Sequence, residues 1–317
     1  MNHLPEMESN AKILLFGEYT VLLNSPALSI PFPVFSGQLR QAGTVPSEEQ
    51  ENSNKELHGL LSFLRKTASS WKSPYSIDLD AFSDDLTRHL WFDSNIPYGY
   101  GLGSSGALIA AIYKKYGIHK EAEYYLEREL LWELREYLAS LESFYHGKSS
   151  GLDPLVSFLN KSVLISGGQE ISVVETKWDE QSGKGAMFLV DSGAAGETGP
   201  LVHNFRQQYA QRNFKEQLDN EFLPLVQEAI HQYLAFDSES LLATVKRISR
   251  FQLEHMNKMI PGSIAESWKM GLQEDLFFMK LCGSGGGGMF LGFTADLEAV
   301  VKRFPGLDPI IVHRLKF

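Results

Sequence analysis

The chain has 317 residues, of which 43% are hydrophobic and 12% aromatic, enough to bury a large core in about two domains. Its 29 Lys and Arg residues against 39 Asp and Glu residues give a net charge of −10, which argues against nucleic acid as the main partner. We expect no secretory signal and no membrane-spanning segment, and the single Cys282 excludes an intrachain disulfide. These features predict a globular, cytoplasmic protein without nucleic-acid or membrane partners.

The first half of the chain mixes predicted strands and helices. The polar stretch 41–56 contains Gly, Pro and Asn without periodicity, which indicates a surface loop. Leucines at helical spacing predict an amphipathic helix over 57–70, and further helices are predicted directly after Gly106 and over 121–144. Apolar or alternating runs predict strands at 11–16, 25–32, 76–80 and 88–96.

The second half contains a long helical region between strands. Residues 200–276 are predicted to be mostly helical, with a kink at Pro224. A helix is predicted near 295–303. Strands are predicted in a hairpin over 162–175, at 187–193, on both sides of a glycine loop within 277–293, and near 309–316. The composition changes near residue 185, so we predict one domain over 1–185 and a second over 186–317.

Residues 97–106 (PYGYGLGSSG) have the composition of a phosphate-binding loop. Glycines expose backbone N–H groups, and the helix that follows adds its unpaired N–H groups and its dipole. An ordinary strand–turn–helix corner with serine caps is the alternative. The spacing also matches a dinucleotide fingerprint, but no second strand ending in an acid follows. A Walker A loop ending at Ser149 fails, because Glu142 stands where that motif requires glycine.

A second glycine loop, GSGGGG at 283–288, lies between two apolar strands. Four consecutive glycines cost backbone entropy that an ordinary turn does not require. We therefore predict a close approach of this backbone to a ligand or to the first loop. A loose hairpin is the alternative.

Three segments, taken in order, resemble the motifs of the GHMP kinase superfamily: 12–22 (KILLFGEYTVL), 97–107 (PYGYGLGSSGA) and 282–289 (CGSGGGGM). Within that superfamily, 142–153 (ESFYHGKSSGLD) resembles the mevalonate kinase segment that carries a metal-binding glutamate and a catalytic aspartate. The sequence departs from many mevalonate kinases at Tyr19, where histidine is common, and at Gly196 and Glu197, where a basic residue is common. Both departures concern the acceptor.

The resemblance implies an α+β fold, the GHMP kinase fold, with a ribosomal-protein-S5-domain-2-like N-terminal half and a ferredoxin-like C-terminal half. It implies ATP and Mg²⁺ as cofactors and a small-molecule acceptor, mevalonate, phosphorylated to 5-phosphomevalonate for isoprenoid precursor synthesis. It is compatible with a homodimer. The alternatives are a phosphomevalonate kinase, another small-molecule or sugar kinase of the superfamily, an ATP-dependent decarboxylase, and a non-catalytic binding module.

The resemblance also assigns roles to residues. Asp153 becomes the catalytic base and Lys12 its catalytic partner, although local sequence alone favours a helix N-cap before Pro154 as the role of Asp153. Glu142 and Ser105 become Mg²⁺ ligands, and Ser104 could exchange roles with Ser105. The implied acceptor-side residues are Glu18, Tyr19 and Thr198. The implied ATP-binding residues are Pro97, Gly99, Gly101, Leu102, Gly103, Ser104, Ser105, Gly106, Gly285, Gly286 and Gly287.

Overall fold

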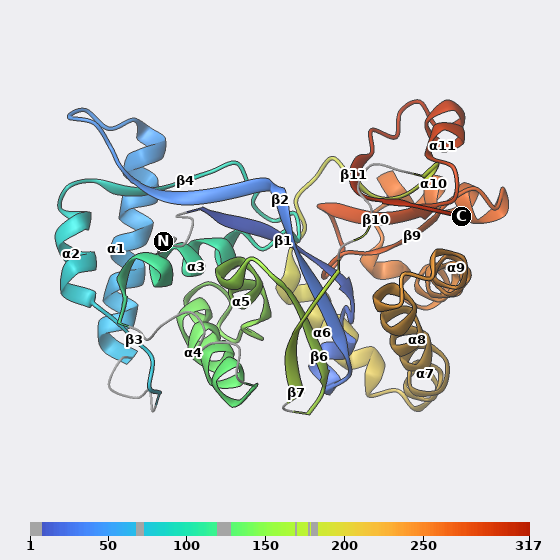
Figure 1. Ribbon diagram of the computed structural model, residues 1–317, viewed down its shortest axis with the longest axis horizontal. Coiled ribbons are helices and arrows are strands. Elements are labelled where there is room, and N and C mark those ends of the chain that lie inside the picture. The colour runs from blue at the N-terminus through green and yellow to red at the C-terminus, as the bar shows by residue number, and fades with distance from the viewer. Residues whose placement is uncertain (1–7, 68–72, 119–127, 169, 177, 179–182) are drawn as a thin grey trace.

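The computed structural model describes residues 8–67, 73–118, 128–168, 170–176, 178 and 183–317. Two antiparallel sheets organise the chain, the first in the left and centre of Figure 1 and the second on the right. The first has the order β1-β2-β6-β7, and β4 also pairs with β2. Its strands are β1 (Ser9–Phe16), β2 (Ala27–Gln41), β4 (Leu90–Ser94), β6 (Ser162–Gly167) and β7 (Glu170–Val174). Two short strands, β3 (Ser76–Ile77) and β5 (Gly117–Ile118), pair separately.

Eleven α-helices surround the sheets in the described part of the chain. Those before the second sheet are α1 (Glu48–Thr67), α2 (Leu79–Leu86), α3 (Ser104–Tyr116), α4 (Arg128–His146) and α5 (Leu152–Leu159). The others are α6 (Thr198–Tyr209), α7 (Arg212–Gln217), α8 (Leu223–Leu234), α9 (Ser238–His255), α10 (Gly262–Gln273) and α11 (Leu297–Arg303). None of the helices described here combines the length and apolar composition needed to cross a membrane.

The second sheet has the order β11-β8-β10-β9, and all its pairs are antiparallel. Its strands are β8 (Gly185–Asp191), β9 (Phe278–Leu281), β10 (Met289–Thr294) and β11 (Ile310–Leu315). Helices connect β8 to β9 and β10 to β11, which gives the β-α-β-β-α-β succession of a ferredoxin-like unit. This agrees with the expectation for the C-terminal half.

Two apolar cores lie on opposite faces of the first sheet. Helices α1 to α5 enclose one core, to which strands β6 and β7 also contribute. The other core joins β1 to the second sheet and to helices α6 to α10, and it therefore runs through both halves of the chain. Phe16 at the end of β1 stacks on Phe293 of β10, for example. Because this core is shared, the division at residue 185 remains a prediction.

The predicted surface loop over 41–56 is wrong in its second half. Strand β2 continues to Gln41 because its last five residues pair with β4, and helix α1 begins at Glu48. The Gln50 side chain accepts from the Ser47 N–H, and the Gln50 N–H donates to Ser47 Oγ, which is a capping box. Three glutamates in the first turn add favourable charge at the helix N-terminus.

Other helix predictions differ at their ends. Residues 68–70 and 121–127 of the predicted helices lie outside the described part of the chain.

The predicted strand at 76–80 is only two residues long, because Asp78 caps α2 by accepting from the Ala81 N–H. Pro224 sits in the first turn of α8, after a π-helical segment over Leu218–Phe222 that joins α7 to α8.

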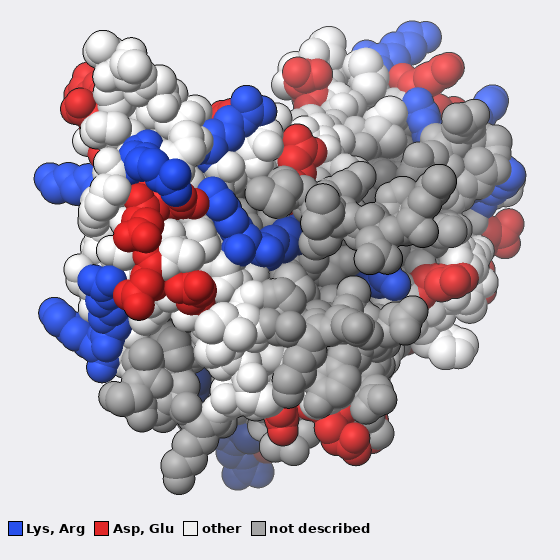
Figure 2. Space-filling view, turned by 60° about the vertical axis from the view of Figure 1, so that its left-hand side comes forward, with Lys and Arg blue, Asp and Glu red and all other residues white. Residues whose placement is uncertain are grey.

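Figure 2 shows one face of the molecule, on which Lys and Arg side chains lie side by side with Asp and Glu side chains. In the described part of the chain, several exposed charged groups form ion pairs, such as Arg40 with Asp93 on neighbouring strands. Exposed pairs of this kind contribute little to stability. The described part of this face therefore carries charge of both signs.

Candidate active site

The first glycine loop, residues 97–106, turns from β4 into helix α3. Gly99, Gly101 and Gly103 all have positive φ, between +76° and +78°, a conformation that other residues rarely adopt. Gly103 is the N-cap of α3 and supplies no side-chain cap, so the N–H groups of the first turn face the loop without a side-chain acceptor. This arrangement can bind an anion such as a phosphate.

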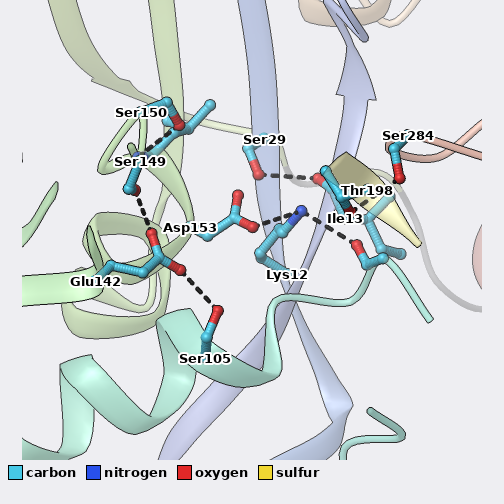
Figure 3. Close-up of polar contacts among 12 residues, drawn as sticks. Lys12, Ile13, Ser29, Ser105, Glu142, Ser149, Ser150, Asp153, Thr198 and Ser284 are labelled. Carbon is cyan, nitrogen blue, oxygen red and sulfur yellow. Dashed lines mark hydrogen bonds and ion pairs between the residues drawn. The ribbon is translucent and has the colours of Figure 1, made fainter. Parts of the chain in front are cut away.

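An ion pair lies beside this loop (Figure 3). Lys12 Nζ on β1 is 3.0 Å from Asp153 Oδ2 in the first turn of α5, and it also donates to the Gly101 carbonyl at 3.1 Å. The lysine side chain is only 5% exposed, whereas the aspartate side chain is 31% exposed. The ammonium thus joins the carboxylate to the glycine loop, and the carboxylate still reaches the surface.

Two glycines allow the Lys12–Asp153 ion pair to lie this close to the loop. A Cβ added to Gly103 would lie 2.9 Å from two carbons of Lys12. A Cβ added to Gly106 would lie 2.8 Å from the Cβ of Asp153 and 2.9 Å from its carbonyl carbon. The absence of side chains at these positions lets helices α3 and α5 meet closely enough to set the ion pair against the loop.

A second carboxylate lies on the other side of the ion pair. Glu142, on α4, is only 3% exposed. It accepts hydrogen bonds from Ser105 Oγ at 2.9 Å and from Ser149 Oγ. Burial, with a further contribution from the charge of Asp153, raises the pKa of Glu142 to about 7, although both serine hydrogen bonds act in the opposite direction. We call Lys12, Ser105, Glu142, Ser149 and Asp153 the carboxylate cluster.

The carboxylate cluster offers hard oxygen donors, a carboxylate and a hydroxyl, of the type that Mg²⁺ prefers. Sites for Mg²⁺ beside a nucleotide use one or two protein ligands and complete the shell with phosphates and water. A buried carboxyl with a raised pKa is also one that a cation would stabilise in its charged form. Glu142 and Ser105 therefore fit a Mg²⁺ ion. The described residues contain no cluster of three or more His, Cys, Asp or Glu suited to binding a metal by protein ligands alone.

The second glycine loop, 283–288, packs directly on the first. The Met289 N–H donates to the Tyr100 carbonyl at 3.1 Å, and a Cβ on Gly288 would lie 2.5 Å from Tyr100 Cα. A Cβ on Gly101 would lie 3.1 Å from the Cys282 carbonyl oxygen. The predicted close approach of the two glycine loops is therefore confirmed, and the loose-hairpin alternative is wrong.

A third segment, 192–197, locks the two loops together. The Gly196 N–H donates to the Gly99 carbonyl at 2.9 Å, and the Gly288 N–H donates to the Ala194 carbonyl at 2.6 Å. A Cβ on Gly287 would lie 2.6 Å from that same carbonyl oxygen. A Cβ on Gly285 or Gly286 would also meet protein atoms, the Met259 carbonyl and the Leu201 side chain. Packing alone thus accounts for three glycines assigned to ATP binding, and that assignment stays a prediction.

The predicted acceptor-side residues separate into two environments. The hydroxyl of Tyr19 donates to the Ser284 carbonyl, and its ring stacks on Phe205 of α6 with centroids 4.7 Å apart. Burial raises the pKa of Tyr19, so this hydroxyl stays protonated. Thr198, the first residue of α6, places Oγ1 3.1 Å from Ser284 Oγ. We call Tyr19, Thr198, Phe205 and Ser284 the tyrosine cluster.

Glu18 does not join the tyrosine cluster. Its side chain is fully buried and forms an ion pair with Lys280 of β9. Sequence reasoning missed Lys280, although a single lysine in the apolar run FFMKL signals a buried charge that needs a partner. It also missed Ser149 and Ser284, whose only signal was their position in the glycine-containing motifs. Ser104 opens helix α3, but Ser105 is the serine that contacts Glu142.

Comparison with known proteins matches residues 67–161 to the family described as GHMP kinases N terminal domain. Mevalonate kinase from Thermococcus sibiricus is 23% identical, and the alignment covers 95% of this chain and 93% of that protein. The crystal structure of L. major mevalonate kinase in complex with R-mevalonate matches with a TM-score of 0.61 at 15% identity, covering 94% of this chain and 90% of that one. Streptococcus pneumoniae phosphomevalonate kinase in complex with phosphomevalonate and AMPPNP matches with a TM-score of 0.60 at 13% identity, covering 96% and 98%.

Proposed function

Because this chain carries a GHMP kinase N-terminal domain in a GHMP kinase fold, we propose that it transfers the γ-phosphoryl group of ATP to a hydroxyl of mevalonate. The fold and superfamily expected from the three sequence motifs are confirmed. The observation that carries the proposed reaction is the carboxylate cluster at the N-terminus of α3, with the Lys12–Asp153 pair on one side and the Ser105–Glu142 contact on the other. Phosphoryl transfer depends mainly on positioning and charge neutralisation, and this cluster has groups suited to both.

The N-terminus of α3 is the proposed binding site for the ATP phosphates. Its first-turn N–H groups and its dipole attract negative charge, and the glycines of residues 97–106 leave the backbone open to close approach. Glu142 and Ser105 are the residues that would hold Mg²⁺. A Mg²⁺ ion bound there would neutralise negative charge on the phosphates during transfer.

Asp153 is the proposed base. Its carboxylate accepts the proton of the acceptor hydroxyl as that oxygen bonds to the γ-phosphorus and the bond from the γ-phosphorus to ADP breaks. Its partial exposure lets the proton leave to water afterwards. Lys12 orients the carboxylate through the ion pair and adds positive charge where the acceptor oxygen becomes more negative. Its second contact, to the Gly101 carbonyl, holds the ammonium at the loop.

The tyrosine cluster is the proposed wall of the acceptor pocket. The hydroxyls of Thr198 and Ser284 are available to a polar acceptor, while the Tyr19 ring is fixed by Phe205 and by the Ser284 carbonyl. Helix α6 begins at Thr198, and the positive end of its dipole favours an acceptor with a carboxylate. This supports mevalonate even though Gly196 stands where a basic residue is common.

Phosphomevalonate is the second candidate acceptor, supported by the structural likeness to the pneumococcal phosphomevalonate kinase. We rank it below mevalonate because its reacting group is a phosphate, whose negative charge would face the carboxylates of Asp153 and Glu142.

The test is ADP release by the purified chain with MgATP and each of mevalonate, phosphomevalonate, diphosphomevalonate, homoserine and galactose. We expect ADP with mevalonate alone. Release of ADP with another acceptor would support the proposed reaction but identify a different substrate. Release of CO₂ with diphosphomevalonate would show that the protein is a decarboxylase and not a kinase. An absence of turnover with all five would contradict the proposal.

A further inference from the structure

One ion pair in the core joins residues 262 positions apart. The Lys280 ammonium of β9 contacts Glu18 Oε1, and both side chains are 0% exposed. Lys280 also donates to the Leu281 carbonyl at 2.6 Å, and its Nζ lies 5.4 Å from the centre of the Phe16 ring. Within the described residues, the second oxygen of Glu18 has no hydrogen-bond partner. The pair is therefore surrounded by apolar groups and incompletely satisfied.

Burying such a pair costs more free energy than filling the same space with apolar side chains. Taking two charges out of water costs several kcal/mol for each ion, and apolar residues of similar volume are often as stable or more stable. All four residues of β9 are buried, and the other three are Phe278, Met279 and Leu281. An apolar residue at position 280 would suit the strand equally well. The pair therefore points to a role in geometry rather than in stability.

The residues next to the ion pair show which part of the molecule it holds in place. Glu18 precedes Tyr19, which has φ of +62° and donates to the Ser284 carbonyl. Lys280 stands just before the second glycine loop, and Ser284 stands within it. Two adjacent residues of the first motif thus contact strand β9 and the loop that follows it, at positions four residues apart. The ion pair holds the strand that enters the loop, and the tyrosine holds the loop itself.

We infer that Lys280 is a positioning residue that, through its ion pair with Glu18, seats the second glycine loop on the first motif and so assembles the tyrosine cluster. Without the pair, the entry to the loop loses its buried anchor, and Ser284 is no longer held opposite Thr198. The inference about structure rests on the contacts alone. Its consequence for the acceptor rests on the proposed function.

The reactivity of the Cys282 thiol reports directly whether the second glycine loop stays packed on the first motif. It is the only cysteine, it is buried, and it lies between Lys280 and the glycines. Burial raises the pKa of its thiol, which keeps it unreactive, whereas the positive charge of Lys280 lowers that pKa. Removing Lys280 by itself would therefore slow thiol modification. Faster modification in a Lys280 variant reports an opened loop and not a change of local charge.

The experiment measures the rate at which Ellman's reagent modifies Cys282 in the folded protein, well below its melting temperature. In Lys280→Met we expect at least about a tenfold faster reaction than in the wild type. The control is Lys246→Met, because Lys246 pairs with Asp275 and lies 5.4 Å from the Phe278 ring, but it is partly exposed and does not border the loop. The control should react at the wild-type rate. A Lys280→Met protein with unchanged Cys282 protection would overturn the inference.

The single variant leaves Glu18 buried and unpaired, so it could fail to fold. The double variant Glu18→Leu with Lys280→Met replaces both charged groups by apolar side chains of similar volume and leaves no buried polar group unpaired, so it supplies a second test. We expect a melting temperature near that of the wild type, together with faster Cys282 modification and a KM for mevalonate raised by about tenfold. If the ion pair served only stability, the double variant would have the wild-type melting temperature, rate of Cys282 modification and KM for mevalonate. That result would overturn the inference. If the wild-type chain phosphorylates none of the acceptors, the proposed function fails and the thiol measurement still decides the inference.

Discussion

The carboxylate cluster and the tyrosine cluster, the two parts of the proposed site, are built differently. The carboxylate cluster takes all its residues from the first 153 positions, and four of them, Ser105, Glu142, Ser149 and Asp153, fall within the family match over 67–161. The tyrosine cluster combines residues 19, 198, 205 and 284, all outside that match. The first cluster is charged and the second is neutral.

Because of this difference, we expect one cluster to determine the reaction and the other to determine which acceptor is used. The groups proposed to act in phosphoryl transfer follow the pattern that the family resemblance implies, whereas the departures from that pattern, at Tyr19, Gly196 and Glu197, lie in or next to the tyrosine cluster. Variants of the carboxylate cluster should therefore affect turnover or the metal whatever the acceptor. Variants of the tyrosine cluster should affect the KM for the acceptor and leave ATP kinetics unchanged.

The largest effect is expected for Asp153→Asn. The amide cannot accept the hydroxyl proton, so kcat should fall by about a thousandfold while ATP affinity stays within about twofold. Turnover is measured by ADP release and ATP affinity by calorimetry. The control is Asp93→Asn, which removes an exposed carboxylate paired with Arg40 on the first sheet. Wild-type turnover in Asp153→Asn would remove this residue from the mechanism.

Glu142→Gln should act on the metal. The neutral side chain keeps a contact for Ser105 but loses the charge, so the Mg²⁺ concentration for half-maximal activity should rise by at least about tenfold. Titration of activity with Mg²⁺ at saturating ATP measures this. A variant with the wild-type Mg²⁺ requirement would contradict the assignment of Glu142 as a ligand.

The same residue predicts how stability depends on pH. The pKa of Glu142 is raised to about 7 from an ordinary value of 4.5, so the folded, ligand-free protein keeps a proton that the unfolded chain loses as pH rises between these values. This contribution to stability is complete below about pH 4.5 and is lost as pH rises through about 7, for a total of roughly 3 kcal/mol. Urea unfolding at about pH 5 and about pH 8 should show this loss in the wild type and not in Glu142→Gln. Equal pH dependence in both proteins would contradict it.

A smaller effect is expected where the two glycine loops meet. Gly288→Ala places a methyl group 2.5 Å from Tyr100 Cα and should lower the free energy of unfolding by about 2–3 kcal/mol. The control is Gly168→Ala, which has a similar positive φ, +60° against +71°, but no atom within 4 Å of the added carbon. It should cost only about 1 kcal/mol from backbone strain. Equal losses would mean that backbone strain, and not loop contact, explains Gly288.

The smallest effect is expected for Tyr19→Phe. The ring still stacks on Phe205, but the hydrogen bond to the Ser284 carbonyl is lost, at a cost of about 1 kcal/mol. The KM for mevalonate should rise about fivefold, and the KM for ATP should not change. An equal rise in both values would show that the tyrosine cluster is not specific to the acceptor end.

The sequence predicted most elements, the composition of the site and the approach of the two glycine loops, but not the other long-range contacts. The glycine loop followed by helix α3 was predictable because glycine and apolar periodicity act locally, as was the β9–loop–β10 hairpin. The start of α1 was missed, although Ser47 and Gln50 stand at capping-box spacing. The Lys12–Asp153 pair was expected only through the family resemblance, since no local pattern brings residues 141 positions apart together. The Glu18–Lys280 pair depends on how the two sheets pack, which single-sequence patterns do not record.

The most direct test of the account is the identity of the bond that the protein makes. The chain is incubated with MgATP and mevalonate, and the products are followed by ³¹P nuclear magnetic resonance. We predict ADP and, in equal amount, a phosphate monoester whose phosphorus couples to the protons of a CH₂ group. Inorganic phosphate without an ester, or ATP that remains intact, would contradict the central claim that this site transfers a phosphoryl group to an alcohol.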